Sequence, residues 1–107
     1  MDDPLIYVKL HNTREGKILA MCDASALNKV LKEGGIVIDT KTYADFYKGR
    51  LMKVDGLDSV TISDIDSANI VGEEAVTAAV ERYIVAKNNV KTVRGVPYAH
   101  AYRIRSH

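Results

Sequence analysis

The apolar residues of this chain fall mostly into short segments, and polar or glycine-containing turns separate them. Segments of this kind are typical of β-strands, whereas a helix needs a longer stretch with its apolar residues on one face. Residues 72–86 form such a stretch. The pattern predicts an α+β fold, not a regular parallel α/β fold: a two-layer sandwich with a mixed or antiparallel sheet of about five to seven short strands and two main helices.

Two β-hairpins are expected, one near each end of the chain. Residues 5–11 alternate between the two faces of a strand, residues 12–16 supply turn formers, and residues 17–22 return as the antiparallel partner. Residues 90–93 and 98–104 are expected as two strands joined near Gly95. The other strands are expected at residues 36–38 (buried), 50–54 (at a sheet edge) and 60–62.

The longer helix is expected over residues 72–86. Its predicted buried stripe consists of Ala75, Val76, Ala79, Val80, Tyr83 and Ile84. Glu73 and Glu74 would lie near the positive end of the helix dipole and Lys87 near its negative end. A second helix of about nine residues is expected through residues 26–31, ended by the glycines at 34 and 35.

Composition favours a folded domain inside the cell. The 107 residues fit a single domain, 1–107, with 47% hydrophobic and 27% charged residues. The apolar runs are too short to cross a membrane, and the acidic residues 1–4 do not resemble a signal peptide. Cys22 is the only cysteine, so an internal disulfide is excluded and a reducing compartment fits. We expect a cytoplasmic protein without membrane contact.

Charge is unevenly distributed along a chain whose net charge is only +1. Residues 54–81 contain seven acids and no lysine or arginine, whereas residues 82–107 contain six basic residues and no acid. Aromatic residues accompany the basic ones in the last predicted strand. In an extended strand, Tyr98, His100 and Tyr102 share one face and Arg103 lies on the other.

These residues suggest contact with single-stranded RNA, in which rings stack on bases and cations contact phosphates. The candidate binding residues are Arg94, Tyr98, His100, Tyr102, Arg103, Lys48 and Arg50. The alternative is structural: the rings pack as core or cross-strand partners, and the arginines form a solvated edge. The low net charge favours this alternative, because dedicated nucleic-acid binders are more basic.

No motif predicts catalysis, a metal site or a cofactor. The glycines form neither a phosphate-binding loop nor a dinucleotide fingerprint. The three histidines are far apart in sequence and have only Cys22 as a soft companion, so no metal site is predicted. Cys22 could be a nucleophile at a strand-to-helix junction, but a small buried apolar residue is the stronger interpretation. Catalytic residues are therefore not assigned.

Several short blocks, in order along the chain, resemble an archaeal protein family catalogued as domain of unknown function 424. The block residues without an assigned role are Cys22, Asp23, Phe46, Tyr47, Gly49, Asn69, Gly72, Glu73, Gly95 and Pro97. In the family's closing block a histidine follows the proline and a glutamine comes two positions later, where this chain has Tyr98 and His100. The resemblance implies a single-domain archaeal cytoplasmic α+β protein with no established activity and an expected association with translation.

The block residues also have physical interpretations. Asn69 and Gly72 precede the longer helix and could satisfy backbone groups or form a turn there, or the helix amides could bind an anion, which Glu73 and Glu74 would repel. Phe46 and Tyr47 could cover the end of the core or supply a stacking ring.

Three functional hypotheses follow. The first is a non-catalytic binding module for RNA or a ribonucleoprotein. The second is a protein-interaction or self-assembling (homo-oligomeric) subunit that uses the opposite charges of the two segments. The third is an unfamiliar enzyme with a pocket near Cys22 or His100. The placement of five residues separates these hypotheses: Asn69, Glu73, Phe46, Tyr98 and His100. Their convergence on a cleft would favour ligand binding, whereas dispersal into the core and turns would favour structural roles.

Overall fold

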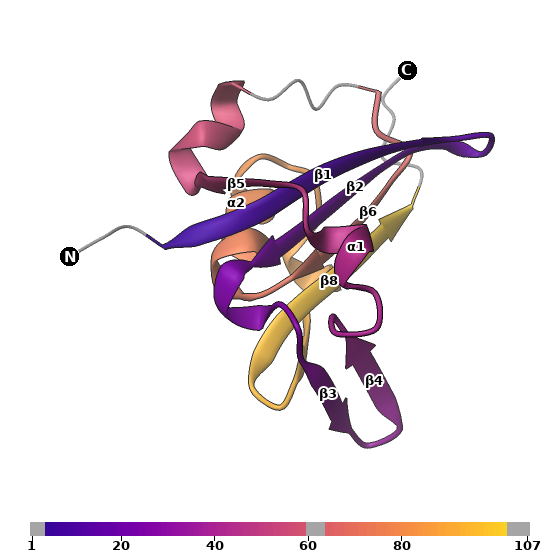
Figure 1. The fold of residues 1–107 in the computed structure, drawn as a ribbon, viewed down its shortest axis with the longest axis vertical. Helices are drawn as coiled ribbons and strands as arrows, with labels where there is room; N and C mark the ends of the chain where they lie inside the picture. Colours follow the sequence, from indigo (N-terminus) through magenta and orange to yellow (C-terminus); the bar gives the residue numbers. More distant parts are fainter. Residues whose placement is uncertain (1–3, 60–63, 103–107) are drawn as a thin grey trace.

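The computed structural model describes residues 4–59 and 64–102, which form a six-stranded sheet, a separate two-stranded sheet and two α-helices. The strands are β1 Leu5–Thr13, β2 Gly16–Asp23, β3 Val30–Glu33, β4 Ile36–Asp39, β5 Arg50–Lys53, β6 Ser67–Val71, β7 Lys91–Val93 and β8 Val96–Tyr102. The α-helices are α1 Ala44–Tyr47 and α2 Glu73–Glu81. Three short 3-10 helices are labelled η1 Ala24–Ala26, η2 Val54–Ser59 and η3 Lys87–Asn89. The main sheet has the order β5-β1-β2-β6-β8-β7. Its β2–β6 pair is parallel, and its other pairs are antiparallel. The predicted α+β fold is confirmed (Figure 1).

Both predicted hairpins are present. β1 and β2 pair from Ile6 opposite Asp23 to Thr13 opposite Gly16, and β7 pairs with β8. β5 pairs with β1 at the edge of the sheet, as predicted for residues 50–54. The predicted strand at 60–62 and the last residues of the predicted strand at 98–104 lie outside the described residues.

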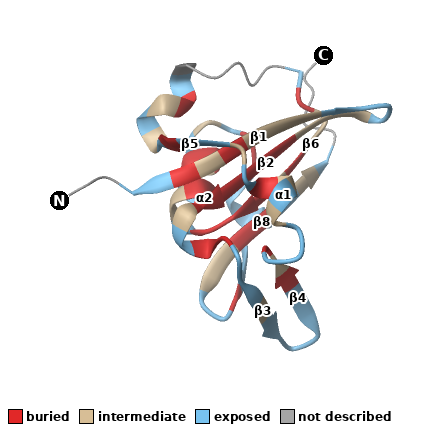
Figure 2. Ribbon diagram, viewed as in Figure 1, coloured by how far each residue is buried: buried red, intermediate tan, exposed pale blue. Residues whose placement is uncertain are grey.

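Helix α2 covers one face of the main sheet. Its buried residues Ala75, Val76 and Ala79 pack with side chains of β1, β2 and β6, among them Leu19 and Ile70. These strand residues alternate with residues that point to the opposite face, so the α2 face holds one apolar cluster and the opposite face a second. Figure 2 shows buried residues along the central strands and α2.

The helix is shorter than predicted because its carboxyl end forms a Schellman motif. Tyr83 adopts a left-handed conformation (φ 60°), its N–H donates to the carbonyl of Val80, and the N–H of Ile84 donates to that of Ala79. The predicted placement of Tyr83 in the buried stripe is wrong, since this residue is 90% exposed. Lys87 begins η3 and does not lie in the last turn of α2, contrary to prediction.

The predicted helix through residues 26–31 is also wrong. The chain forms the short η1 turn and then β3, which pairs with β4 across Gly34 (φ 54°) and Gly35 (φ 85°). Two successive residues with positive φ form the tight turn that a β-hairpin favours, so these glycines connect strands and do not end a helix. Of the predicted buried strand at 36–38, only Ile38 is buried.

The opposite face of the main sheet is partly covered by α1, η1 and the β3–β4 hairpin (Figure 1). Thr40, which is fully buried, fixes the start of the hairpin to its end: its hydroxyl donates to the carbonyl of Ala26, and the N–H of Lys29 donates to that hydroxyl over 3.0 Å. Ile38 and Tyr47 bring β4 and α1 into the cluster on this face. The part of this face that these elements leave uncovered lies between the β3–β4 hairpin, α1, β6 and β8.

Candidate functional site

A groove of about 480 Å³ lies on this second face of the sheet. It is lined by Val37, Ile38, Asp39, Tyr43, Phe46, Tyr47, Asn69 and His100. These residues come from β4, the segment before α1, α1 itself, β6 and β8. The fold thus brings together three residues of the family blocks, Phe46, Tyr47 and Asn69, with His100 of the predicted RNA-binding strand.

Two polar side chains on neighbouring strands contribute to the groove. Asn69 of β6 and His100 of β8 are direct partners in the antiparallel register, and both therefore lie on the same face of the sheet. Neither the carboxamide of Asn69 nor the imidazole of His100 forms a hydrogen bond within the part of the chain that the structure describes. Their donors and acceptors are available to a ligand.

Helix α1 is only four residues long, and side chains of β1 hold it in place. The ring of His11 stacks on that of Phe46 with centroids 4.5 Å apart and planes inclined by 7°. His11 Nε2 lies 2.8 Å from the carbonyl oxygen of Phe46, and Lys9 Nζ donates to the carbonyl of Asp45 over 2.6 Å. A helix of one turn is not stable alone, so these contacts fix the aromatic wall of the groove.

The two aromatic residues of α1 have different surroundings. Tyr47 is 8% exposed, and its ring meets that of Phe46 edge-on, with centroids 5.0 Å apart. Burial raises the pKa of Tyr47 to about 12, so its hydroxyl stays protonated. Tyr43, just before the helix, is 62% exposed at the rim of the groove. An exposed ring at a groove rim is available for stacking.

One charged residue, Asp39, lines the groove, and Lys91 lies near enough to His100 to influence its pKa. Partial burial lowers the pKa of His100, and the positive charge of Lys91 lowers it further, so the imidazole is neutral at pH 7. Hydrogen bonds from Thr42 and the backbone N–H of Lys41 lower the pKa of Asp39. The Asp39 carboxylate caps its own turn, with Oδ1 3.0 Å from the nitrogen of Lys41 and 2.8 Å from that of Thr42.

A second group of block residues builds the start of α2. The carboxylate of Asp23, at the end of β2, accepts hydrogen bonds from the N–H groups of Glu74 (3.1 Å) and Ala75 (2.8 Å). Gly72 has φ 109°, and a Cβ at this position would lie 2.3 Å from Cγ of Asp23. Its N–H donates to the carbonyl of Pro97 over 2.8 Å. These residues join β2, α2 and β8 structurally.

This arrangement corrects two expectations for the start of the helix. Asn69 was expected to satisfy backbone groups near α2, but it lies within β6, and Asp23 accepts the hydrogen bonds instead. The same carboxylate occupies the amides that would bind an anion, which removes the alternative of an anion site at this helix. Burial raises the pKa of Asp23, although the backbone N–H donors oppose this shift.

The other block residues also have structural explanations. Cys22 is fully buried, and burial together with the neighbouring Asp23 raises its pKa to about 12, which confirms the prediction of a buried apolar residue and argues against a thiolate nucleophile. A Cβ on Gly49 would lie 2.3 Å from the carbonyl oxygen of Val8. Gly95 has φ 78° in the β7–β8 turn.

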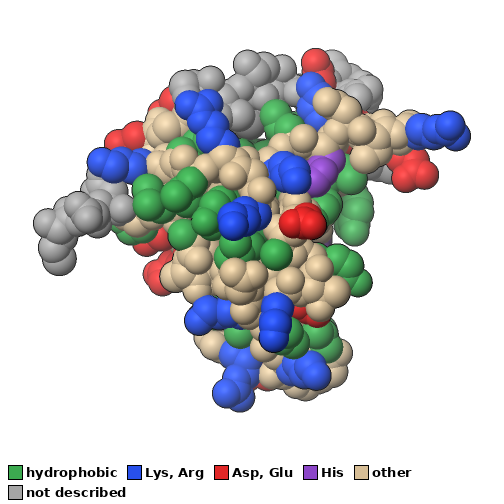
Figure 3. Space-filling model, viewed as in Figure 1, with side chains coloured by type: hydrophobic (Ala, Val, Ile, Leu, Met, Phe, Trp, Pro, Cys, Tyr) green, Lys and Arg blue, Asp and Glu red, His purple; other side chains and the backbone are tan. Residues whose placement is uncertain are grey.

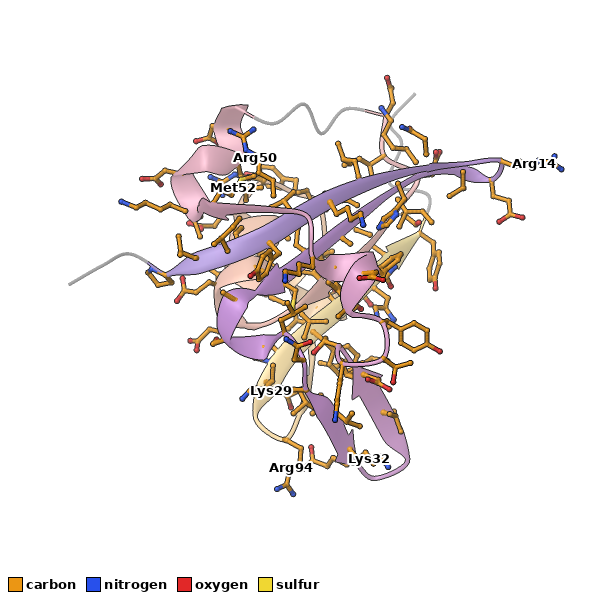
Figure 4. All side chains as sticks on the ribbon, viewed as in Figure 1. Arg14, Lys29, Lys32, Arg50, Met52 and Arg94 are labelled. Carbon is orange, nitrogen blue, oxygen red and sulfur yellow. The ribbon has the colours of Figure 1, made fainter. Side chains whose placement is uncertain are left out.

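The residues predicted to bind RNA do not form one surface. Arg94 lies in the β7–β8 turn, where its N–H donates to Glu33 Oε1 over 3.0 Å, and Figure 4 shows it at the opposite end of the molecule from Arg50. Lys48 caps α1, with its N–H 2.7 Å from the carbonyl oxygen of Ala44. Arg103 lies outside the described residues.

The aromatic residues of β8 divide between core and surface. Tyr98 is 7% exposed and belongs to the second apolar cluster, as the structural interpretation predicted. Its ring contacts that of His100 with centroids 5.7 Å apart. Tyr102 is 76% exposed. The exposed part of this strand therefore begins at His100, next to the groove.

Sequence reasoning missed the contributions of Asp39, Tyr43 and Lys91. The aromatic-rich segment 43–49 was a usable signal for Tyr43. Asp39 lines the groove and Lys91 influences His100 only through the pairing of β4 with β3 and of β7 with β8, which local patterns do not determine.

No cluster of three or more His, Cys, Asp and Glu side chains in residues 4–59 and 64–102 is arranged to hold a metal ion. Among the helices that the structure describes, none combines the length and apolar character needed to span a membrane.

The fold and groove define a small α+β domain with one sheet face under a helix and a ligand-sized groove on the other. A family model described as "Protein of unknown function (DUF424)" matches residues 11–104, and the chain belongs to this family. The crystal structure of an uncharacterized conserved protein from Methanopyrus kandleri is similar, with a TM-score of 0.75, 22% identity and coverage of 96% of this chain and 95% of that one. At this identity the likeness shows the fold. No curated protein matches.

Proposed function

We propose that the protein is a non-catalytic module that binds single-stranded RNA, with an unpaired base in the groove. One observation carries the proposal: Asn69 and His100, whose side chains form no hydrogen bond among the described residues, lie beside the aromatic residues Tyr43 and Phe46 around a single groove. These groups supply what base recognition needs, namely rings for stacking and polar atoms for the base edge.

The dimensions and polarity of the groove support a planar ligand of this kind. Its volume of about 480 Å³ falls within the range of small-molecule sites. Phe46 is held by its stack on His11, so that this wall is ordered before a ligand arrives. An ordered wall lowers the entropy lost on binding.

Cations near the groove would contact the phosphates on either side of the bound base. Lys91 lies close enough to influence His100, and Lys41 close enough to influence Asp39. Beyond them, Figure 3 shows lysine and arginine side chains around the end formed by the β3–β4 hairpin, and Figure 4 places Lys29, Lys32 and Arg94 there. With about two or three phosphate contacts, log K should fall with log salt with a slope of about −1.4 to −2.1.

Fluorescence anisotropy with labelled RNA of about nine nucleotides tests the proposal at several salt concentrations. Tyr43→Ala should weaken binding about 5- to 150-fold, because one stacked base contributes about 1–3 kcal/mol. Tyr83→Ala is the matched control, since Tyr83 is exposed at the end of α2. The proposal fails if micromolar protein shows no salt-dependent binding, or if the two variants lose the same affinity.

Self-assembly is a second candidate, favoured by the separation of charge. Exposed acids lie on α2 at Glu73 and Glu81, while Lys29, Lys32 and Arg94 lie at the hairpin end. Contact between the acidic face of one copy and the basic end of another would be heterologous and sensitive to salt. A mass by light scattering that stays monomeric at low salt and high protein concentration excludes this candidate.

A further inference from the structure

The base that the groove accepts follows from the chemistry of Asn69, and this inference rests on the proposed function. A carboxamide presents one acceptor oxygen beside an N–H donor, and it forms a paired hydrogen bond with any group that offers a donor beside an acceptor. Asn69 is suited to this role because its carboxamide has no partner among the described residues and lines the groove.

The four RNA bases differ in how well they match this pair. The Hoogsteen edge of guanine offers two acceptors, N7 and O6, which suit arginine better than a carboxamide. Adenine offers its N6 amino group beside N7, and this is the established partner of asparagine. It repeats the donor and acceptor pattern with N6 and N1 on its Watson–Crick edge. Of these two edges, guanine (N1–H beside O6), uracil and cytosine offer such a pair on the Watson–Crick edge alone.

The other groove residues favour the same base. The amino group of adenine has a second hydrogen, which the acceptor nitrogen of the neutral His100 can take. Purines also present a larger ring system to Tyr43 and Phe46 than pyrimidines do. We infer that the groove binds an unpaired adenine of single-stranded RNA, with its N6 and N7 or N6 and N1 atoms paired to the carboxamide of Asn69.

The test compares four labelled RNAs of about nine nucleotides that differ only in the central base. This base is adenine, guanine, cytosine or uracil, and all other positions are uridine. The adenine RNA should bind about 5- to 150-fold more tightly than the others, as expected for one paired contact. Equal affinities for all four, or a preference for another base, overturn the inference while the proposed function stands. Absence of binding to every RNA contradicts the proposed function itself.

Asn69→Asp tests the residue. The substitution keeps the side-chain shape but replaces the N–H donors with a second acceptor, so the preference for adenine should disappear. Asn12→Asp is the matched control: it adds the same charge, and by the alternation of β1 it lies on the α2 face of the sheet. The control should keep the preference.

Each variant supplies its own reference, because the measured quantity is the ratio of its affinities for the adenine and uridine RNAs. If Asn69→Asp does not fold, Asn69→Ser removes the carboxamide without adding charge and answers the same question. A folded variant at position 69 that keeps the full preference for adenine overturns the assignment to Asn69.

Discussion

Replacement of Gly72 by alanine should cost more stability than an ordinary change at a glycine. Gly72 has φ 109° and ψ 152°, a backbone conformation in which residues with a Cβ are strained by about 1–3 kcal/mol. The added Cβ would lie 2.3 Å from Cγ of Asp23, so this carboxylate must move away from the helix amides. Loss of a helix cap costs about 0.5–2 kcal/mol. Together these terms predict a loss of about 1.5–5 kcal/mol.

Urea denaturation followed by circular dichroism measures this loss. A domain of this size has a stability of about 5–15 kcal/mol, so the variant should still fold with a clearly lower midpoint. Gly34→Ala is the matched control, because Gly34 also has positive φ but a Cβ there meets nothing within 4 Å. The control should lose only about 1–2 kcal/mol.

A double-mutant cycle separates the two causes. An Asp23→Ala background removes the conflict with Cγ and Oδ1 and leaves only that with Cβ of residue 23, at 2.6 Å, so Gly72→Ala should cost less there than in the wild type. Equal losses for Gly72→Ala and Gly34→Ala, or no coupling between positions 72 and 23, would refute the structural explanation of this family block.

Three further results are expected from the ionisable groups. The thiol of Cys22 has a pKa of about 12 and no exposed surface. It should therefore react with a disulfide reagent only as fast as the protein unfolds. Rapid reaction of the native protein would contradict the burial of this residue. The pKa of Asp23 is raised in the folded state, so the folded protein binds this proton more tightly than the unfolded chain. The wild type should therefore gain stability relative to Asp23→Asn as the pH falls towards 3.8 and lose this stability as the pH rises. Denaturation curves of the two proteins that show no pH-dependent difference would contradict this. The imidazole of His100 should titrate below 6.5 by NMR, and Lys91→Gln should move its pKa upwards; an unchanged pKa in that variant would show that Lys91 has no influence on it.

Local sequence patterns determined the elements whose signals are strong and independent of context. The alternation of residues 5–11 and the turn formers after it predicted the β1–β2 hairpin, and the helical spacing of Ala75, Val76 and Ala79 predicted the core of α2. The failure at residues 26–31 has a physical cause: short apolar spacings fit both periods, and the buried hydroxyl of Thr40 favours the hairpin. Local sequence patterns cannot predict the contact between Thr40 and Ala26, because these residues are 14 positions apart.

The candidate site was predictable only in part. Phe46, Asn69 and His100 were each singled out from the sequence, but their convergence depends on the parallel pairing of β2 with β6 and the antiparallel pairing of β6 with β8. The structural role of Asp23 likewise depends on a contact across 52 residues to the N–H of Ala75. Strand order therefore separates the block residues into a groove and a helix cap.

RNA binding is proposed for the groove on the face opposite α2. An NMR titration of isotope-labelled protein with the adenine-containing RNA tests this claim directly, because it locates the contact residue by residue. Saturable shifts are expected at Tyr43, Asn69 and His100, with Tyr83 unchanged. Saturable shifts confined to α2, or no shifts at millimolar RNA, would contradict it.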